Sequence, residues 1–324
     1  MKTFAKRSGW IVSIAMVAFL LSCGDEGPTD GMDACQQIEQ PAIDRRDYIP
    51  VDAVKMSPDD DSTPPVLHLT KMFDDPVPLN STVNTAGAED SAFFAGDTET
   101  LYFWFTPDVR VAVEDQVLDP STGIYRSLRQ GDAWQSPQKV WLFDIASLEG
   151  CACVQGNTIW YCAAVCGMTG MHHFYSEYED GNWSPGQLSK ILNQADYEIG
   201  EFHVTPDGNE IYFHSNRTGG QGGNDLWVIE KTGARWGNPV PLTALNTEYD
   251  EGFPFVTADG TELWFSGDSR IDVALPLGTP DYFGAIFYST KEGDSWSTPV
   301  EVVSELVGEP TVDPQGNVYF THHY

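Results

Sequence analysis

Short runs of alternating apolar and polar residues, each interrupted by a tight turn, recur along the chain about every 50 to 60 residues. The two clearest copies occupy residues 201–213 and 253–265, with Asp-Gly at the turn of each. Weaker copies cover residues 91–103, 151–162 and 309–320. Alternation with a period of two predicts strands, and Gly or Asn at the turn tolerates positive φ. Each copy therefore predicts a hairpin of two strands, a and b.

A second motif follows each of the first four hairpins. It is a strand, then a glycine and, two or three residues later, a tryptophan, with a proline shortly after: Trp134, Trp183, Trp236 and Trp296. This motif predicts a second hairpin, c and d, so that each repeat holds four strands. Four-stranded repeats of this length are typical of propeller blades. The tryptophans are expected to pack between blades.

The numbers of the two hairpins differ by one, because there are five a–b hairpins and four Trp-marked c–d hairpins. The missing pair is found before the first repeat, where residues 76–79 and Asn84-Thr85 match residues 239–242 and Asn246-Thr247. Residues 66–70 supply the preceding strand c. The sequence therefore predicts an all-β fold, a single five-bladed β-propeller closed by N-terminal strands that complete the last blade. Such closure leaves no free sheet edge.

The third repeat carries a more specific pattern. It reads Val-Thr-Pro-Asp-Gly-Asn-Glu-Ile-Tyr-Phe-His-Ser-Asn-Arg over residues 204–217, and a Gly-rich turn leads to Asp225, Leu226 and Trp227. This resembles the WD40-like propeller repeat of TolB-type proteins. The resemblance is good in the fourth repeat, weak in the others, and covers about residues 65–324. It implies a periplasmic or cell-surface propeller that binds partners, usually without catalysis.

The N-terminus reads as an export signal. Lys2, Lys6 and Arg7 precede an apolar run at residues 11–21, which is too short to span a bilayer and has the length of a signal-peptide core. Residues 20–24, Leu-Leu-Ser-Cys-Gly, resemble the bacterial lipobox and predict lipidation of Cys23; the alternative is an ordinary secretion signal. We expect a lipoprotein signal peptide (1–22), a flexible polar tether (23–50) and the propeller (51–324), anchored in the bacterial cell envelope, at the periplasmic side or the cell surface.

Five further cysteines follow Cys23, namely Cys35, Cys151, Cys153, Cys162 and Cys166. Export favours disulfides, and because five is an odd number at least one thiol has no partner within the set. A metal site is the alternative for the last four, with His172 and His173 close by. Zinc sites usually show Cys-x2-Cys spacing, which is absent here. We therefore expect one or two local disulfides among Cys151, Cys153, Cys162 and Cys166, and no metal.

Charge restricts the partners. The chain has 17 Lys and Arg against 48 Asp and Glu, a formal net charge of −31. Such a field repels phosphate, which excludes sequence-independent nucleic-acid binding and electrostatic docking on anionic lipid. Contact with the membrane is therefore expected only through the lipid anchor.

In a propeller, the linkers from strand d to the next strand a and the loops between b and c share one face beside the channel. The linkers bring Asp90, Glu201, Asp250, Glu251 and Glu309 to this face, and the loops bring His214, Arg217 and Asp225. These eight residues are the ligand-binding candidates. The structural alternative is that the carboxylates form solvated linkers and that Asp225 pairs with Arg217 to hold the Gly-rich loop.

The favoured function is a monomeric binding or scaffolding module whose partner is an envelope protein, a peptide or a glycan. One alternative is a glycoside hydrolase or lyase that uses carboxylates of this face, which need a separation of roughly 5 to 10 Å. Another is a structural divalent-cation site, such as calcium, at the channel mouth, although Asp59, Asp60 and Asp61 lack EF-hand spacing. Catalytic and cofactor-binding signatures are absent from the sequence, so no catalytic residue and no cofactor is predicted.

Overall fold

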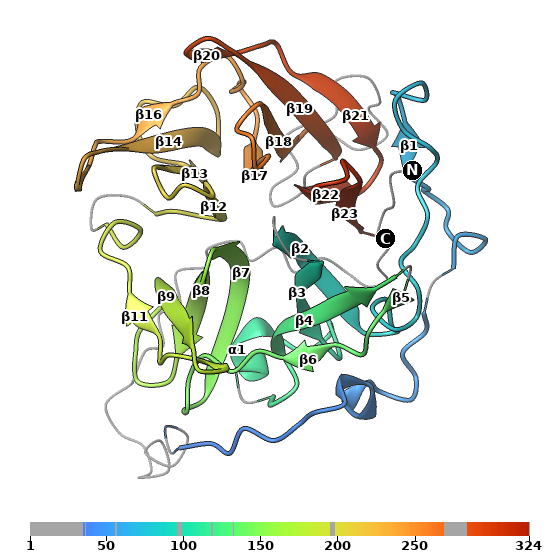
Figure 1. Cartoon of the computed structure of the whole chain (residues 1–324). Helices are drawn as coiled ribbons and strands as arrows, with labels where there is room; N and C mark the ends of the chain where they lie inside the picture. The colour runs from blue at the N-terminus through green and yellow to red at the C-terminus, as the bar shows by residue number, and fades with distance from the viewer. Residues whose placement is uncertain are drawn as a thin grey trace.

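The structure is a computed structural model, and it describes residues 35, 37–55, 57–95, 99–117, 119–131, 133–194, 198–268 and 284–323. The predicted signal peptide and Cys23 lie outside the described residues. The fold is all-β, with four antiparallel sheets placed around a common axis as in a propeller (Figure 1). In the described part of the chain, no helix is long and apolar enough to cross a membrane.

The first two blades follow the predicted a–b–c–d order. In each blade the short strand after the c–d turn pairs with the end of strand c, and a further short strand pairs with its middle. The first blade contains β2 (Ala88–Ala95), β3 (Thr100–Thr106), β4 (Gly123–Gln130), β5 (Ala133–Trp134) and β6 (Gln138–Lys139). The second contains β7 (Ser147–Gln155), β8 (Thr158–Val165), β9 (Met171–Glu179), β10 (Asn182–Trp183) and β11 (Gln187–Leu188). The four-residue helix α1 (Val113–Gln116) lies in the loop between β3 and β4.

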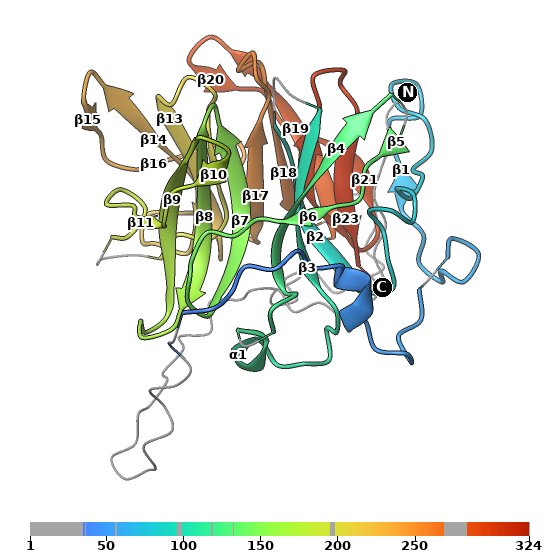
Figure 2. The same ribbon diagram turned by 60° about the horizontal axis from the view of Figure 1, so that its bottom comes forward.

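The third and fourth blades repeat this order. The third contains β12 (Phe202–Val204), β13 (Glu210–Ser215), β14 (Asp225–Thr232), β15 (Arg235–Trp236) and β16 (Val240–Pro241). The fourth contains β17 (Glu251–Val256), β18 (Glu262–Gly267), β19 (Ala285–Glu292), β20 (Ser295–Trp296) and β21 (Val300–Ser304). Figure 2 shows the hairpins β14–β15 and β19–β20 at one end of the ring and α1 at the other. The two interleaved sequence motifs thus correspond to hairpins of four blades.

The last repeat forms a two-stranded sheet, β22 (Val307–Val312) and β23 (Val318–His322), between the fourth and first blades (Figure 1). The predicted pairing of residues 66–70 with this sheet is wrong. Instead β1 (Val66–Leu67) pairs with β21, where Val66 lies opposite Ser304. His68 continues the contact, since its N–H donates to the Val302 carbonyl over 2.8 Å. The segment thus covers the outer edge of the fourth blade, which would otherwise be an open edge.

The predicted flexible tether is also corrected for its described part. Cys35 forms a disulfide with Cys166, 131 residues away in the sequence. Gln37 bridges Ile145, and a 3-10 helix, η2 (Arg45–Tyr48), lies against the first blade with Arg45 only 3% exposed. From Cys35 onward the chain is therefore fixed to the propeller, because a covalent bond and a buried cation hold it there.

The remaining cysteines differ in part from expectation. Cys151 and Cys162 form a local disulfide between β7 and β8. Cys166 pairs with the distant Cys35, and the candidate Cys153 forms no disulfide. The Cys153 sulfur instead lies 3.2 Å from the Val204 amide of the third blade, in a buried position that raises the pKa of the thiol to about 12. The thiol of Cys153 is thus protonated and enclosed at neutral pH.

Candidate functional site

The innermost strands carry one equivalent position in each of the five repeats, and we call these five residues the axial layer. They are Ser91, Cys151, Glu201, Phe253 and Glu309. Four of them have positive φ: 45° at Ser91, 55° at Cys151, 53° at Phe253 and 59° at Glu309. The strand register shifts at each of these four positions, which are β-bulges. Bulges redirect side chains at the cost of an unfavourable backbone.

Two axial-layer residues and one neighbour form a carboxyl cluster, the channel cluster of Asp90, Glu201 and Glu309. Ser91 joins its members: its amide donates to Glu309 Oε2 over 2.8 Å, and its hydroxyl donates to Glu201 Oε1 over 3.3 Å. The Thr321 hydroxyl donates to Glu309 over 2.9 Å. The cluster therefore connects the first, third and last repeats, and all three carboxyl groups are half-buried.

The proximity of these carboxyl groups changes their protonation. Burial, together with the charge of Asp90, raises the pKa of Glu201 to about 8. Burial also raises the pKa of Glu309 well above its ordinary value, with further contributions from the charge of Asp90 and from a hydrogen bond to it. Two carboxyl groups at hydrogen-bond distance must share a proton, because both cannot ionise at low cost. At neutral pH the channel cluster thus holds protons that isolated glutamates would release.

Glu251 does not belong to this cluster, although it was predicted beside Glu201. It occupies the position two residues before the axial layer, as Glu89 and Glu149 do. Each of the three accepts a hydrogen bond from a nearby hydroxyl, from Thr247, Thr85 and Ser147 respectively. Glu251 is 1% exposed and also accepts the Thr247 amide over 2.9 Å. Glu89 and Glu251 thus fasten the preceding linker onto the innermost strand, whereas Glu149 bonds a residue of its own strand, β7.

The other predicted ligand residues also contact neighbouring protein groups through hydrogen bonds or ring packing. Asp225 accepts the amides of residues 221 and 222, and Asp250 accepts the Asn224 amide over 2.6 Å, so both hold the Gly-rich loop. The Arg217 guanidinium lies 4.7 Å from the Trp227 ring centre. His214 packs against Phe253, and burial lowers the pKa of its imidazole to about 4. The structure thus brings together Asp90, Glu201 and Glu309 of the eight candidates.

Aromatic rings fill the axis beside the channel cluster. Phe93, His203 and Phe255 lie two residues after the axial layer in their strands. Their ring centroids are 5.8 Å (Phe93–His203), 5.9 Å (Phe93–Phe255) and 4.8 Å (His203–Phe255) apart. All three are buried. Since these rings meet from three blades, they separate the channel cluster from the a–b turns.

Charge on the N-terminal segment is also locally satisfied. Asp61, from the acidic run at residues 59–61, lies 3.0 Å from His322 Nε2, with both side chains fully buried. Within the described ranges, no group of three or more His, Cys, Asp or Glu side chains is arranged to hold a metal ion.

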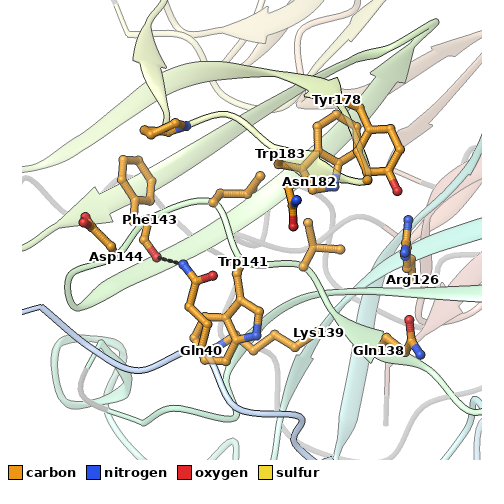
Figure 3. A pocket seen from close by; sticks show the side chains of 14 residues that line it. Gln40, Arg126, Gln138, Lys139, Trp141, Phe143, Asp144, Tyr178, Asn182 and Trp183 are labelled. Carbon is orange, nitrogen blue, oxygen red and sulfur yellow. Dashed lines mark hydrogen bonds between the residues drawn. The ribbon is translucent and has the colours of Figure 1, made fainter.

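A cavity of about 240 Å³ lies between the first and second blades (Figure 3). We call it the aromatic groove. Its chemistry is given by four aromatic residues (Trp141, Phe143, Tyr178, Trp183), three amides (Gln40, Gln138, Asn182), two basic residues (Arg126, Lys139) and one acidic residue (Asp144). Trp134 and Trp296 are buried as expected for residues between blades, whereas Trp183 is half-buried and lines the groove. One sequence signal points here: Trp141 stands where the next two repeats have Lys190 and Thr243.

A second cavity, of about 410 Å³, adjoins the aromatic groove. Arg126, Tyr178 and Trp183 line both cavities, and the second one continues to the a–b turns at Gly156 and Pro206. The channel cluster lies near the beginning of the innermost strands, whereas these turns follow their ends. The two cavities therefore open away from the acidic face on which the sequence placed the ligand.

No family model matches the chain, and no curated protein matches it in sequence. Solved structures similar to it include TolB from Acinetobacter baumannii, at 13% identity and TM-score 0.41 over 72% of this chain and 48% of that chain. The chain thus spans about half the length of that protein. A protein of Agrobacterium tumefaciens assigned as TolB is 14% identical, with TM-score 0.39 over 68% and 69% of the two chains. The endo-arabinase of Bacteroides thetaiotaomicron is 12% identical, with TM-score 0.43 over 71% and 87%.

Proposed function

We propose that the protein is a binding module of the bacterial cell envelope that holds a glycan in the aromatic groove. The observation that carries the proposal is the composition of this groove. Four aromatic side chains and three side-chain amides from two blades and the N-terminal segment line one cavity. Binding sites combine apolar and aromatic walls with a few placed polar groups in this way.

The ring and amide side chains match the surface of a sugar. A sugar ring has apolar C–H faces and a rim of hydroxyl groups that both donate and accept hydrogen bonds. Tyr178 and Trp183 lie 4.9 Å apart and offer broad apolar surfaces, and an amide such as that of Asn182 donates and accepts at once. Gln40 is held in place because its amide donates to the Phe143 carbonyl over 3.1 Å.

We propose that the module is a five-bladed propeller with β22 and β23 as its fifth blade, and that residues 76–85 are the link from this blade into the first. The Thr85–Glu89 contacts support this: Glu89 accepts the Thr85 amide and hydroxyl, as Glu251 accepts those of Thr247. Residues 76–85 thus lead into the first blade as residues 239–247 lead into the fourth. We propose that the protein acts as a monomer.

The proposed location rests on covalent features. Two disulfides require an oxidising compartment, which for a bacterial protein is the envelope. The predicted lipidation of Cys23 places the anchor twelve residues before Cys35. Cys35 is bonded to Cys166, and Gln40, five residues after Cys35 in the chain, lines the aromatic groove. The predicted anchor thus precedes a groove residue by 17 positions in the sequence.

Substitution of Trp183 tests the proposed site. A glycan-array screen first identifies the oligosaccharide that binds the wild type most tightly. Trp183→Ala in the full-length protein is expected to raise the dissociation constant for this oligosaccharide about tenfold or more, because an aromatic wall of the groove is removed. Trp236→Ala is the matched control, since Trp236 holds the same place in the third blade but does not line the groove. Isothermal titration after a glycan-array screen measures both. Equal loss in the two variants, or no glycan bound by the wild type, would contradict the proposal.

The second candidate is a glycoside hydrolase or lyase with Glu201 as general acid and Asp90 as its carboxylate counterpart. The observation in its favour is that a pKa of about 8 keeps Glu201 protonated at neutral pH. Glu201→Gln is then expected to reduce glycan cleavage at least a hundredfold, whereas Glu230→Gln, an exposed glutamate on β14, leaves it unchanged. Wild-type protein that releases no reducing ends from any glycan it binds would eliminate this candidate.

A further inference from the structure

We infer that the aromatic groove selects a glycan that bears carboxylate groups, and that Arg126 binds the carboxylate. This inference rests on the proposed function and adds the chemical class of the ligand.

Arg126 is placed in the groove by the register of the first blade. It lies on β4 directly opposite Tyr102 on β3 and Gln138 on β6. Residues directly opposite each other in antiparallel strands share one face of the sheet. This row faces the second blade, and Figure 3 shows Arg126 between Tyr178 and Gln138.

Among the residues that the structure describes, no carboxylate neutralises the charge of Arg126. Other basic residues form ion pairs, as Arg45 does with Glu89, Arg110 with Asp52 and Lys291 with Glu210. In the ranges that the structure describes, no carboxylate forms such a pair with Arg126, although the chain has 48 acidic residues against 17 basic ones. Within the described ranges, an anionic ligand at this guanidinium would displace no protein carboxylate.

The second cation of the groove is already engaged. Lys139 Nζ donates to the carbonyl oxygens of Pro120 and Thr122, over 2.6 and 2.8 Å. It also lies 4.4 Å from the ring centre of Trp141. Asp144, the acidic residue of the groove, accepts the Gln37 amide over 2.8 Å. Arg126 is therefore the charged group with capacity for a ligand.

Neighbouring rings hold the guanidinium of Arg126 in place. Its carbon atom Cζ lies 5.9 Å from the Tyr178 ring centre, and Tyr102 lies directly opposite Arg126 on β3. A guanidinium fixed in this way keeps a planar pair of N–H donors that matches the two oxygens of a carboxylate. Pre-organisation reduces the entropy lost when the ligand binds.

The two adjoining cavities set the size of the ligand. Arg126, Tyr178 and Trp183 line both of them, and together the volumes of about 240 and 410 Å³ exceed what one sugar ring fills. A ligand that occupies both must pass these three residues. The bound molecule is therefore an oligosaccharide, with a uronic acid residue at the junction.

The net charge of −31 makes this selection a local one, because the long-range field repels an anionic chain. Affinity for the carboxylate then depends on direct contact with Arg126. An acidic peptide would meet the same guanidinium, but the amides and tyrosine and tryptophan faces of the groove favour a sugar. The peptide is an outcome of the test below.

The experiment compares trimers of galacturonate, glucuronate and mannuronate with the same trimers after reduction of their carboxyl groups, by isothermal titration with the full-length protein. We expect at least one uronate trimer to bind about tenfold or more tighter than its reduced form. Arg126→Gln is expected to remove this difference and leave the reduced form unaffected, and Arg126→Lys to restore it only in part. Trp183→Ala weakens both forms.

The outcomes separate the two proposals. Equal affinity for the acidic and reduced trimers, with dependence on Trp183, would overturn the selection by Arg126 and leave the glycan site in place. An Arg126→Gln variant that keeps the full preference would also overturn it. Absence of binding to every trimer contradicts the proposed function and the inference together, and Arg126-dependent binding of a glutamate-rich peptide alone would replace the glycan by a peptide.

Discussion

Arg45→Met is expected to lower the free energy of unfolding by about 3–5 kcal/mol, the cost of removing one partner of a buried ion pair. The Arg45 guanidinium bonds Glu89 and the carbonyl oxygens of residues 82 and 83. It also lies 5.0 and 4.7 Å from the ring centres of Phe103 and Phe105. Methionine has a similar length but no charge, so Glu89 stays buried without its cation. Urea unfolding of the full-length protein measures the change.

Two variants isolate this effect. Arg46→Met is the matched control, because Arg46 pairs with Asp44 at the surface, where both charges remain solvated and little stability depends on the pair. The double variant Arg45→Met, Glu89→Gln is expected to recover part of the loss, since no buried charge then remains. If Arg45→Met is no less stable than Arg46→Met, the N-terminal segment does not hold the first blade as described.

Raising the pH is expected to destabilise the protein through the channel cluster. The folded-state pKa of Glu201 is raised to about 8 from an ordinary value of 4.5. A carboxyl group with a raised pKa contributes stability that is complete at low pH and is lost as the pH rises toward the folded-state value. Between pH 6.5 and 9 we expect the free energy of unfolding to fall by about 2–4 kcal/mol.

This pH window avoids the buried histidines, which act in the opposite direction. Burial lowers the pKa of His203 to about 3 and that of His173 to about 4. Their contribution is lost as the pH falls below 6.5 and is constant above it. Stability is therefore expected to be greatest near pH 6, at about the crossing of the two effects.

Glu201→Gln supplies the comparison, since glutamine cannot ionise. Its unfolding free energy is expected to fall less between pH 6.5 and 9 than that of the wild type, and Glu230→Gln to behave like the wild type. A wild-type stability that is flat or rises across this window would show that the carboxyl groups of the channel cluster are not protonated in the folded protein.

The blades were predictable because a repeat makes one pattern visible several times. The Asp-Gly turns and the Gly-to-Trp motif marked the a–b and c–d hairpins of four blades, and each hairpin forms from residues close in sequence. The pairing of Val66 and Leu67 was not predictable, because a strand of two residues has no periodicity. The choice of β21 as the partner of β1 depends on how the N-terminal segment packs on the fourth blade, which the sequence pattern does not reveal.

The channel cluster was predictable in part, by the same logic. Glu201 and Glu309 share one position of the repeat, so the ring brings them to the axis. Asp90 stands one residue before the axial layer, at a position where the other four repeats have glycine. The first repeat is therefore the one that places a side chain at this position. Glu251 is two residues before the axial layer. At this position its side chain bonds Thr247 of the linker and does not join the channel cluster.

The aromatic groove was not predictable, since its walls come from segments far apart in the sequence. Gln40, Arg126, Trp141 and Trp183 meet only when the first two blades and the N-terminal segment are assembled. Trp183 belongs to a motif whose other members include the buried Trp134 and Trp296, so the pattern alone indicated burial. The exposure of Trp183 depends on its neighbours and not on its repeat position.

Hydrogen exchange of the full-length protein, with and without the tightest-binding uronate trimer, tests the central claim most directly. Binding in the aromatic groove is expected to slow amide exchange in residues 138–144 and 178–185, with little change at residues 198–202 and 305–310. Slowed exchange confined to the latter two segments would place the ligand at the channel cluster and contradict a binding site between the first and second blades.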